Sequence, residues 1–370
     1  MIKYINQLSR IILASVFFGL VFGCSQQEGV TAPKLVAALP LTGDLSFLGT
    51  PGKTAVEIAQ KEAEKAEMPF DVSFVDTKAN PKEMATILRK ELDVNQNKFF
   101  IVTLSGPSLT AAESVSKDEA LILSIAIHPA IPSSDQPVIR FCLSAAQEGE
   151  MLVEHLSKSN SRIGLVVSRD GATTYEVEKT IVPGLQAAEK SIAWTEWFDV
   201  GQRDFKNLAA RFTSSPVDEI LLLGYGSDFP SALSSLASTG KHQSLRIIGG
   251  IGFVELHKIP NGFNADQFSF LAPAFSLGLG GEKAENFRKR YLDATGKMAP
   301  YDAAYTYDAA MTFTGLLHEG KSKPKEFLDV LRNHTIQGVT GTISWDGTGE
   351  ATTDIRWGTF DETGNLVPQS

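Results

Sequence analysis

The chain has 370 residues, of which 43% are hydrophobic and 21% charged, with a formal net charge of −9 and two cysteines. This apolar fraction suits a folded protein rather than a disordered one, and the length suits about two domains. An excess of acidic over basic residues leaves no basic surface for nucleic acid. Two cysteines exclude a disulfide-rich scaffold and a four-thiolate metal site.

Residues 1–23 have the features of an export signal. Lys3 and Arg10 form a short basic region before an apolar run over residues 11–22, and this run is shorter than the roughly 20 residues of a membrane-spanning helix. Gly23 is followed at once by Cys24, a pattern that resembles the lipobox of bacterial lipoproteins. The resemblance implies a lipid on Cys24 and a periplasmic or cell-surface chain anchored to the membrane; an uncleaved anchor helix is the alternative.

Removal of this signal changes the net charge from −9 to −11 and leaves residues 24–33 as a polar tether. With Cys24 lipidated, Cys142 has no partner within the chain. It lies in the apolar run over residues 138–143, so we expect a buried, unreactive thiol.

Short apolar runs alternate with amphipathic stretches through the first 250 residues. The runs predict strands at 35–39, 72–75, 99–104, 121–127, 162–167, 220–223 and 245–248, and the stretches predict helices at 54–67, 81–94, 108–118, 175–190 and 229–239. This alternation indicates an α/β fold with parallel sheets covered by helices on both faces. Beyond residue 280, three helices at 283–294, 305–317 and 325–333 precede a turn-rich end with alternating strands. We therefore expect two similar α/β halves that share a C-terminal region.

The motifs of common enzyme classes are incomplete or missing in the sequence. Residues 49–54 end in Gly-Lys-Thr as a P-loop does, but Phe47 occupies the position of the first P-loop glycine. The six histidines lack metal-site spacing, and there is neither an HExxH nor a GxSxG motif. We predict a protein that is not an enzyme, with no catalytic residue, cofactor or metal ion.

Four segments carry a pattern that extends over most of the chain. They are LVAALPLTGDLSFLG at 35–49, VDTKANP at 75–81, a Phe-Tyr…Gly…Pro-Tyr…Tyr-Asp-Ala series within 287–309, and GVTG…WD…G at 338–349. In order and spacing the set resembles type I periplasmic binding proteins, the substrate-binding components of ABC transporters of the branched-chain amino-acid kind. The resemblance covers about residues 34–365.

This resemblance implies two Rossmann-like lobes joined by a hinge of three crossovers, near 141–146, 271–276 and 345–354. The first lobe would comprise 34–143 plus 273–345, and the second 144–272 plus 346–370. A small molecule would bind between the lobes and close them. The implied function is an extracytoplasmic solute-binding lipoprotein of an ABC importer, monomeric, with the permease subunits as partners. The alternatives are a sensory receptor of the same fold without transport, or a lipoprotein that recruits an envelope partner.

The same resemblance places a ligand carboxylate at two loops of the first lobe. Ser105, Gly106 and Ser108 follow the third strand, where hydroxyls and free backbone N–H groups suit an anion. Ser108 could instead serve only as a helix N-cap. Ile127 and His128 follow the fourth strand; His128 either donates to the anion or merely lies in the loop.

Aromatic and apolar side chains would line the rest of the cleft. Leu48, or its neighbour Phe47, lies in the opening loop that faces the ligand side chain in the family. Tyr225 follows a strong strand between glycines, where the family places a cleft tyrosine. Tyr175 lies near a second such position, although Glu176 replaces the glycine that follows it in the family.

Ile251 departs from the family pattern. Amino-acid binders of the family usually place an acid there to pair with the ligand ammonium, and an unpaired buried ammonium costs several kcal/mol. Either Asp228 or Asp302 substitutes, or the ligand lacks an α-amino group. Tyr301 and Asp302 are expected to reach the cleft from the late helical region. The expected ligand is small and fairly apolar: an amino acid, or a related carboxylate or amide.

Overall fold

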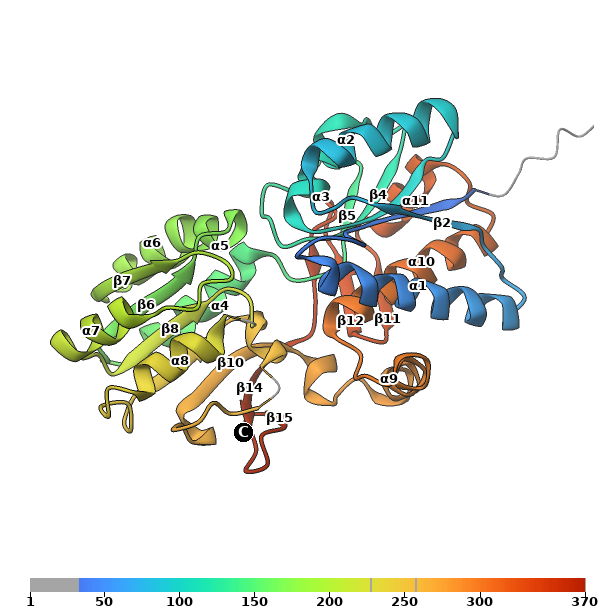
Figure 1. The fold of residues 1–370 in the computed structure, drawn as a ribbon. Coiled ribbons are helices and arrows are strands. Elements are labelled where there is room, and N and C mark those ends of the chain that lie inside the picture. Colours follow the sequence, from blue (N-terminus) through green and yellow to red (C-terminus); the bar gives the residue numbers. More distant parts are fainter. Residues whose placement is uncertain (1–32, 227, 257, 370) are drawn as a thin grey trace, which may run out of the picture. The chain divides into compact units, whose positions relative to one another are not determined.

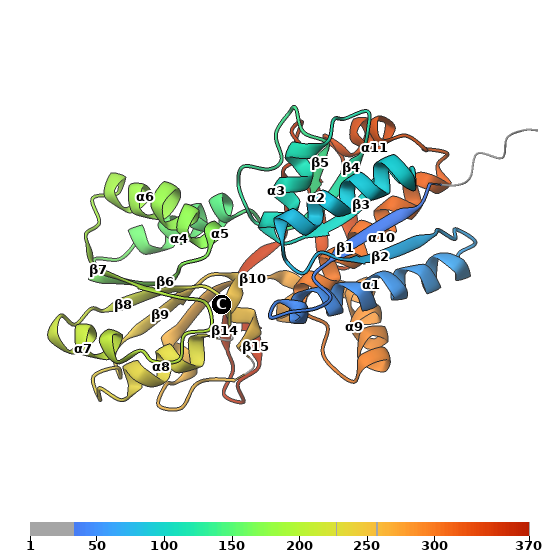
Figure 2. The same ribbon diagram turned by 45° about the horizontal axis from the view of Figure 1, so that its top comes forward.

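The computed structural model describes residues 33–226, 228–256 and 258–369. Two sheets of mainly parallel strands dominate this part of the chain, each with helices on both faces (Figures 1 and 2). The predicted α/β fold with two Rossmann-like lobes is confirmed. The signal at 1–23 and the predicted lipidation residue Cys24 lie outside the described residues. No helix within those residues is both long and apolar enough to cross a membrane.

The sheet of the first lobe has five parallel strands in the order β2-β1-β3-β4-β5. In β1, Leu35 and Ala37 face one core cluster while Val36 and Ala38 face the other, because successive strand side chains point to opposite faces. Both faces are covered by helices, which explains the continuous apolar runs. The strands are β1 (Leu35–Leu39), β2 (Val72–Asp76), β3 (Phe99–Thr103), β4 (Leu121–Ile125) and β5 (Val138–Arg140).

Helices from both ends of the chain cover this sheet. One face carries α2 (Pro81–Arg89), its π-helical continuation η1 (Lys90–Val94) and α3 (Ser105–Ser114). The other carries α1 (Ser46–Lys65) together with α9 (Gly281–Thr295), α10 (Tyr301–His318) and α11 (Pro324–Leu331). Figures 1 and 2 show the late helix α10, in orange, beside the early helix α1, in blue.

The sheet of the second lobe repeats the first and extends it. Its parallel part has the order β7-β6-β8-β9-β10, which is the same 2-1-3-4-5 order as in the first lobe. Two antiparallel strands, β14 and β15, extend the edge at β10. The strands are β6 (Ile163–Ser168), β7 (Ile192–Phe198), β8 (Glu219–Leu223), β9 (Arg246–Gly249), β10 (Phe268–Pro273), β14 (Ile355–Phe360) and β15 (Leu366–Pro368).

Helices cover both faces of the second sheet as well, and short 3₁₀ turns join its elements. α4, α5, the π-helical η2 and α6 pack on one face, and α7, α8 and η3 on the other. The bounds are α4 (Ala145–Ser157), α5 (Gly171–Glu176), η2 (Val177–Ile181), α6 (Val182–Ala187), α7 (Lys206–Ser214), α8 (Phe229–Ala237), and the 3₁₀ turns η3 (Ile251–Glu255), η4 (Ala265–Gln267) and η5 (Ala274–Leu277).

The chain passes between the lobes three times. The passages lie between β5 and α4, between β10 and α9, and at 353–354 before β14. A small antiparallel sheet of β11 (Thr335–Gly338), β12 (Gly341–Trp345) and β13 (Ala351–Thr352) precedes the third passage. Ala351 pairs with Trp345, and both are buried in the first-lobe core. We therefore propose that the last boundary between the lobes follows residue 352 rather than 345.

Several elements begin earlier than the sequence indicates. α1 starts at Ser46 and contains Pro51, whereas the sequence pattern predicts a helix starting at 54. α10 starts at Tyr301 rather than 305. β7, α4 and α7 have no counterpart among the predicted elements. β7 is an edge strand whose side chains are only partly buried, so it lacks the uniform apolar run of the inner strands.

Candidate functional site

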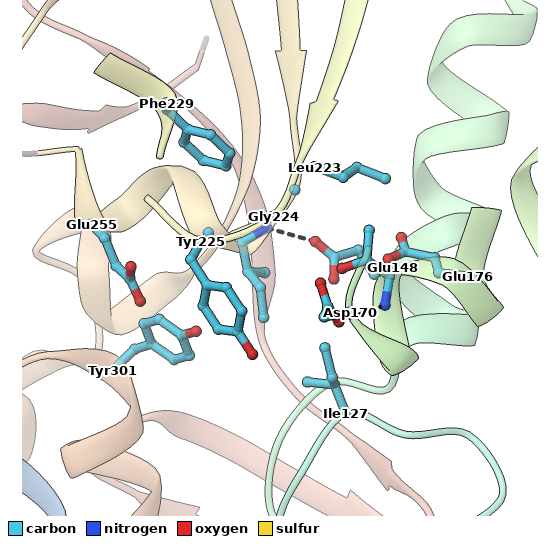
Figure 3. Close-up of a pocket in the computed structure, with 14 residues that line it drawn as sticks. Ile127, Glu148, Asp170, Glu176, Leu223, Gly224, Tyr225, Phe229, Glu255 and Tyr301 are labelled. Carbon is cyan, nitrogen blue, oxygen red and sulfur yellow. Dashed lines mark hydrogen bonds between the residues drawn. The ribbon is translucent and has the colours of Figure 1, made fainter. Parts of the chain in front are cut away.

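A pocket lies where the carboxyl ends of β4, β6, β8 and β9 meet the first turns of several helices. Strand order reverses at β6 and β8, which is where doubly wound sheets bind ligands. The pocket encloses about 80 Å³, enough for several water molecules or a small polar group. Its lining residues, drawn in Figure 3, are Ile127, Glu148, Asp170, Thr173, Glu176, Leu223, Gly224, Tyr225, Phe229, Gly250, Ile251, Gly252, Glu255 and Tyr301.

Glu148 lies on the first turn of α4. That turn is fixed by Ser144, whose side chain caps the helix reciprocally with Gln147. The Glu148 carboxylate accepts a hydrogen bond of 2.6 Å from the backbone N–H of Ile251 (dashed line in Figure 3). A Cβ at Gly250 would lie 2.1 Å from the same oxygen, so only glycine permits this close approach. Burial raises the pKa of Glu148 to about 7, although the Ile251 hydrogen bond opposes the shift.

Asp170 caps the helix that follows β6. One carboxylate oxygen accepts from the backbone N–H groups of Ala172 and Thr173 at 3.1 and 3.0 Å. The other accepts from the hydroxyl of Ser168 at 2.6 Å. Both oxygens therefore have partners within the protein, and Asp170 positions the start of α5 while adding negative charge to the pocket wall.

Glu176 is the buried acid that lacks such partners. It lies at the last residue of α5, is 2% exposed, and its Oε1 has no hydrogen-bond partner among the described residues. Burial raises the pKa of Glu176 well above its usual range, and the charges of Glu148 and Asp170 add to the shift. An ionised carboxylate in this position is costly unless a cation pairs with it.

A second acidic position lies across the pocket. Glu255, at the end of η3, accepts from the backbone N–H of Gly226 at 3.1 Å. Burial raises its pKa to about 7, with a contribution from the charge of Asp228. Figure 3 shows Glu255 on one side of the pocket and Glu148, Asp170 and Glu176 on the other. No lysine, arginine or histidine is among the described residues that line the pocket.

Aromatic side chains form the walls between these two acidic positions. The rings of Tyr225 and Tyr301 lie between them in Figure 3, and Phe229 closes one end. Burial raises the pKa of both tyrosines above the usual range, and the charge of Glu255 contributes to each shift. Both tyrosines are therefore neutral near pH 7. Phe229 is held by stacking on Phe253 at a centroid distance of 4.6 Å.

The structure brings four of the predicted site residues into this pocket. Ile127, Tyr225 and Tyr301 line it with their side chains in Figure 3, and Ile251 contributes the backbone N–H that holds Glu148. Asp228, one candidate for the missing acid, is not among the lining residues; one of its oxygens accepts from the backbone N–H of Gly201 at 3.0 Å.

The other predicted first-lobe residues lie elsewhere. Ser105 and Gly106 form the first turn of α3, and Ser108, inside that helix, donates its hydroxyl to the carbonyl of Val102 at 3.2 Å. The N-cap position of α3 is Leu104, so the N-cap alternative for Ser108 is wrong. None of these residues is among those that line the pocket, and their contact with a ligand stays a prediction.

Three further predicted residues also lie outside the pocket lining. Leu48 is half-buried in α1. The ring of His128 lies 5.8 Å from that of Tyr175, which is 37% exposed on α5. Burial lowers the pKa of His128, and the nearby charge of Arg140 adds to the shift, which favours the neutral imidazole. Cys142 is buried and free, and burial raises the pKa of its thiol to about 12, as expected of an unreactive core cysteine.

Residues 34–365 match the family model for periplasmic binding proteins. A Leu/Ile/Val-binding protein from Citrobacter freundii is 22% identical over 335 residues, covering 86% of each chain. A leucine-, isoleucine-, valine-, threonine- and alanine-binding protein from Pseudomonas aeruginosa is 21% identical over 363 residues, covering 94% of each chain.

Solved structures share the fold. A solute-binding protein of an ABC transporter from Rhodopseudomonas palustris, in complex with 3,4-dihydroxybenzoic acid, has a TM-score of 0.80 at 14% identity, covering 91% of this chain and 96% of its own. A branched-chain amino-acid substrate-binding protein from Streptococcus pneumoniae, in complex with isoleucine, has a TM-score of 0.75 at 19% identity, covering 91% and 100%. The family match over residues 34–365 shows that the chain belongs to the periplasmic binding protein family.

Proposed function

We propose that this protein is the extracytoplasmic solute receptor of an ABC importer and that it closes around a small solute held between its two lobes. One observation carries the proposal: the pocket described above is lined by residues from both lobes, at the carboxyl ends of strands and the starts of helices. Three backbone passages connect the lobes, and such connections suit a hinge that opens and closes over a ligand. The relatives are binding proteins, which favours binding over catalysis.

A lipid on Cys24 would keep the receptor close to its permease. The supporting features are the short apolar run over residues 11–22 and the position of Cys24 directly after Gly23. A lipid anchor paired with a polar tether lets the folded lobes reach a membrane partner without a membrane-spanning helix. The predicted monomeric state is part of the same proposal.

The solute is proposed to be small, with an apolar portion that contacts Ile127, Leu223 and the aromatic walls. Amino acids of this description are named for the curated relatives, and aromatic acids for two structural neighbours. The acids Glu148, Glu176 and Glu255 provide the negative charge that the sequence alone did not supply at Ile251. They favour a solute that carries a protonated nitrogen.

Two measurements test the receptor role. Solute released by denaturing the protein purified from its own host is identified by mass spectrometry. Uptake of that solute is then compared between the host and a strain lacking the gene, with complementation by wild type and by Cys24→Ala. We expect uptake to fall on deletion, to return with wild type, and to return only in part without the lipid cysteine. Bound solute with unchanged uptake would instead indicate the sensory receptor.

A further inference from the structure

Carboxyl groups lie at two separate positions of the pocket, and one of them has an oxygen without a hydrogen-bond partner among the described residues. Asp170 has hydrogen bonds to both oxygens, and Glu148 and Glu255 each accept one from a backbone N–H group. Glu176 Oε1, in contrast, is buried and unpartnered among the described residues. A buried acceptor facing a pocket without a donor is a position for a ligand donor.

A ligand carboxylate does not suit this arrangement. It would add a like charge beside Glu148, Glu176 and Glu255, with no lysine, arginine or histidine among the described lining residues to offset it. Of the residues predicted to bind a carboxylate, Ser108 donates its hydroxyl to Val102 within its own lobe, and Ser105 and Gly106 lie outside the pocket lining. The described lining of the pocket therefore provides no basic side chain to pair with a ligand carboxylate.

The aromatic walls of the pocket suit the alkyl chain of an organic cation. Tyr225 and Tyr301 present neutral aromatic rings between the two acidic positions (Figure 3). An aromatic face attracts an ammonium or guanidinium group and also packs against an alkyl chain. Among the described residues no group of three or more histidines, cysteines or acids is arranged to hold a metal ion, so the candidate is an organic cation.

Resting on the proposed receptor function, we propose that the solute is a small organic amine without a carboxylate, whose ammonium group donates to Glu176 and Glu148 and whose chain lies between Tyr225 and Tyr301. Glu255, across the pocket, provides a position for a second amino group. The inference narrows the solute class to net cations and separates this protein from the amino-acid binders among its relatives.

Isothermal titration calorimetry of the full-length protein with four matched probes tests the inference. Leucine carries both charges, 3-methylbutylamine is the same skeleton without the carboxylate, and 4-methylpentanoate is that skeleton without the ammonium; 1,4-diaminobutane adds a second ammonium. We expect the two amines to bind at least tenfold more tightly than leucine, and 4-methylpentanoate not to bind. Tightest binding of leucine or of 4-methylpentanoate, absence of amine binding, or binding of calcium ion in place of amines would each overturn the inference.

Variants of two nearby acids test whether amine binding depends on Glu176 in particular. Glu176→Gln preserves the shape of the side chain and removes its charge, and we expect it to weaken amine binding ten- to a hundredfold. Glu178→Gln, at an exposed position two residues further along the chain, is the matched control and should stay within twofold of wild type. Equal losses in both variants would contradict a specific role for Glu176.

The outcomes distinguish this inference from the receptor proposal. Tight binding of leucine with gene-dependent leucine uptake would support the receptor and overturn the amine inference. Tight, Glu176-dependent amine binding with uptake unaffected by gene deletion would support the amine inference and contradict the transport role.

Discussion

The two lobes share one strand order yet contribute unequally to the pocket. Both parallel sheets have the order 2-1-3-4-5, and both place loops at the carboxyl ends of their central strands. All pocket-lining residues except Ile127 and Tyr301 come from the second lobe, including every acid. The first lobe contributes apolar and aromatic surface. A repeated fold therefore does not imply a repeated site, because the two lobes place different side chains beside the pocket.

Corresponding loops show how the difference arises. After β3 in the first lobe, Leu104 has a φ of 69° and α3 begins at the next residue, so this lobe has almost no loop there. After β8 in the second lobe, Gly224 has a φ of 146° and the chain continues to Phe229 before α8 begins. The longer connection brings Tyr225 into the pocket, and its backbone at Gly226 holds Glu255.

The buried Arg140 of the first lobe stabilises the fold through its polar contacts. Arg140→Met is therefore expected to cause the largest loss of stability among these predictions. Arg140 is fully buried, donates to the carbonyls of Ala126 and His128, and lies 2.9 Å from the carboxylate of Glu350. Removing the guanidinium leaves Glu350 without its counter-charge, so we expect the free energy of unfolding to fall by about 3 kcal/mol in urea denaturation.

The matched control for that experiment removes both charges. Arg140→Met combined with Glu350→Gln should recover part of the loss, because no unpaired carboxylate remains. If the double variant is no more stable than Arg140→Met, the carbonyl contacts to Ala126 and His128 dominate over the ion pair.

The backbone at Gly250 lies close to the Glu148 carboxylate, and Gly250→Ala would prevent this approach. The new Cβ would lie 2.1 Å from Glu148 Oε1 and 2.9 Å from the side chain of Leu223. We expect a loss of about 2 kcal/mol in stability, measured by urea unfolding, together with loss of solute binding. Gly171→Ala, where nothing lies within 4 Å of the added Cβ, should change stability by less than about 0.5 kcal/mol. Similar losses in both variants would contradict the role of the Gly250 contact.

Glu176→Gln is expected to stabilise the ligand-free protein, in contrast to its effect on binding. The raised pKa of Glu176 means that the folded state holds a proton that the unfolded state releases. Stability from this group is therefore present at low pH and is lost as pH rises through its folded-state pKa. Replacing the carboxyl by an amide removes this pH-dependent cost, so we expect Glu176→Gln to have a higher free energy of unfolding than wild type at pH 8.

The pH dependence of this stabilisation provides the test. Thermal unfolding of wild type, Glu176→Gln and the exposed control Glu178→Gln at pH 5 and pH 8 should show a higher Tm for Glu176→Gln at pH 8 and a smaller difference at pH 5. The carboxyl groups of Glu148 and Glu176 interact electrostatically, so the transition belongs to this pair. A variant less stable than wild type at pH 8 would show that Glu176 supports the fold.

The sequence allowed the fold to be predicted because its inner strands are continuous apolar runs. Segments such as 35–39 and 220–223 are buried on both faces, and that burial is visible in composition alone. The residues at which helices begin were harder to predict from the sequence. Pro51 lies within α1 although it lacks an N–H group, because the rest of the helix packs against α10.

The family resemblance places Tyr301, at the start of α10, in the cleft, and the other predicted residues of the pocket closely follow a strand. Ile127 and Tyr225 were found on that signal, and Asp170, which follows β6 and precedes a helix, carries the same signal but was missed. Glu148 and Glu176 lie within helices and read as ordinary acidic positions of an amphipathic pattern. Only the packing of α4 against α5 shows that both are buried beside the loop of Ile251.

The smallest expected effect belongs to the first lobe. Ser105→Ala removes a hydroxyl that the family resemblance assigns to the ligand but that lies outside the pocket lining. We expect amine affinity within twofold of wild type and a stability change below about 0.5 kcal/mol, measured by calorimetry and urea unfolding. Because Ser105 follows β3 much as Gly224 and Tyr225 follow β8, this variant compares equivalent positions of the two lobes. A tenfold loss of affinity would mean that closure brings the first-lobe loop onto the solute, and that both lobes then supply polar contacts.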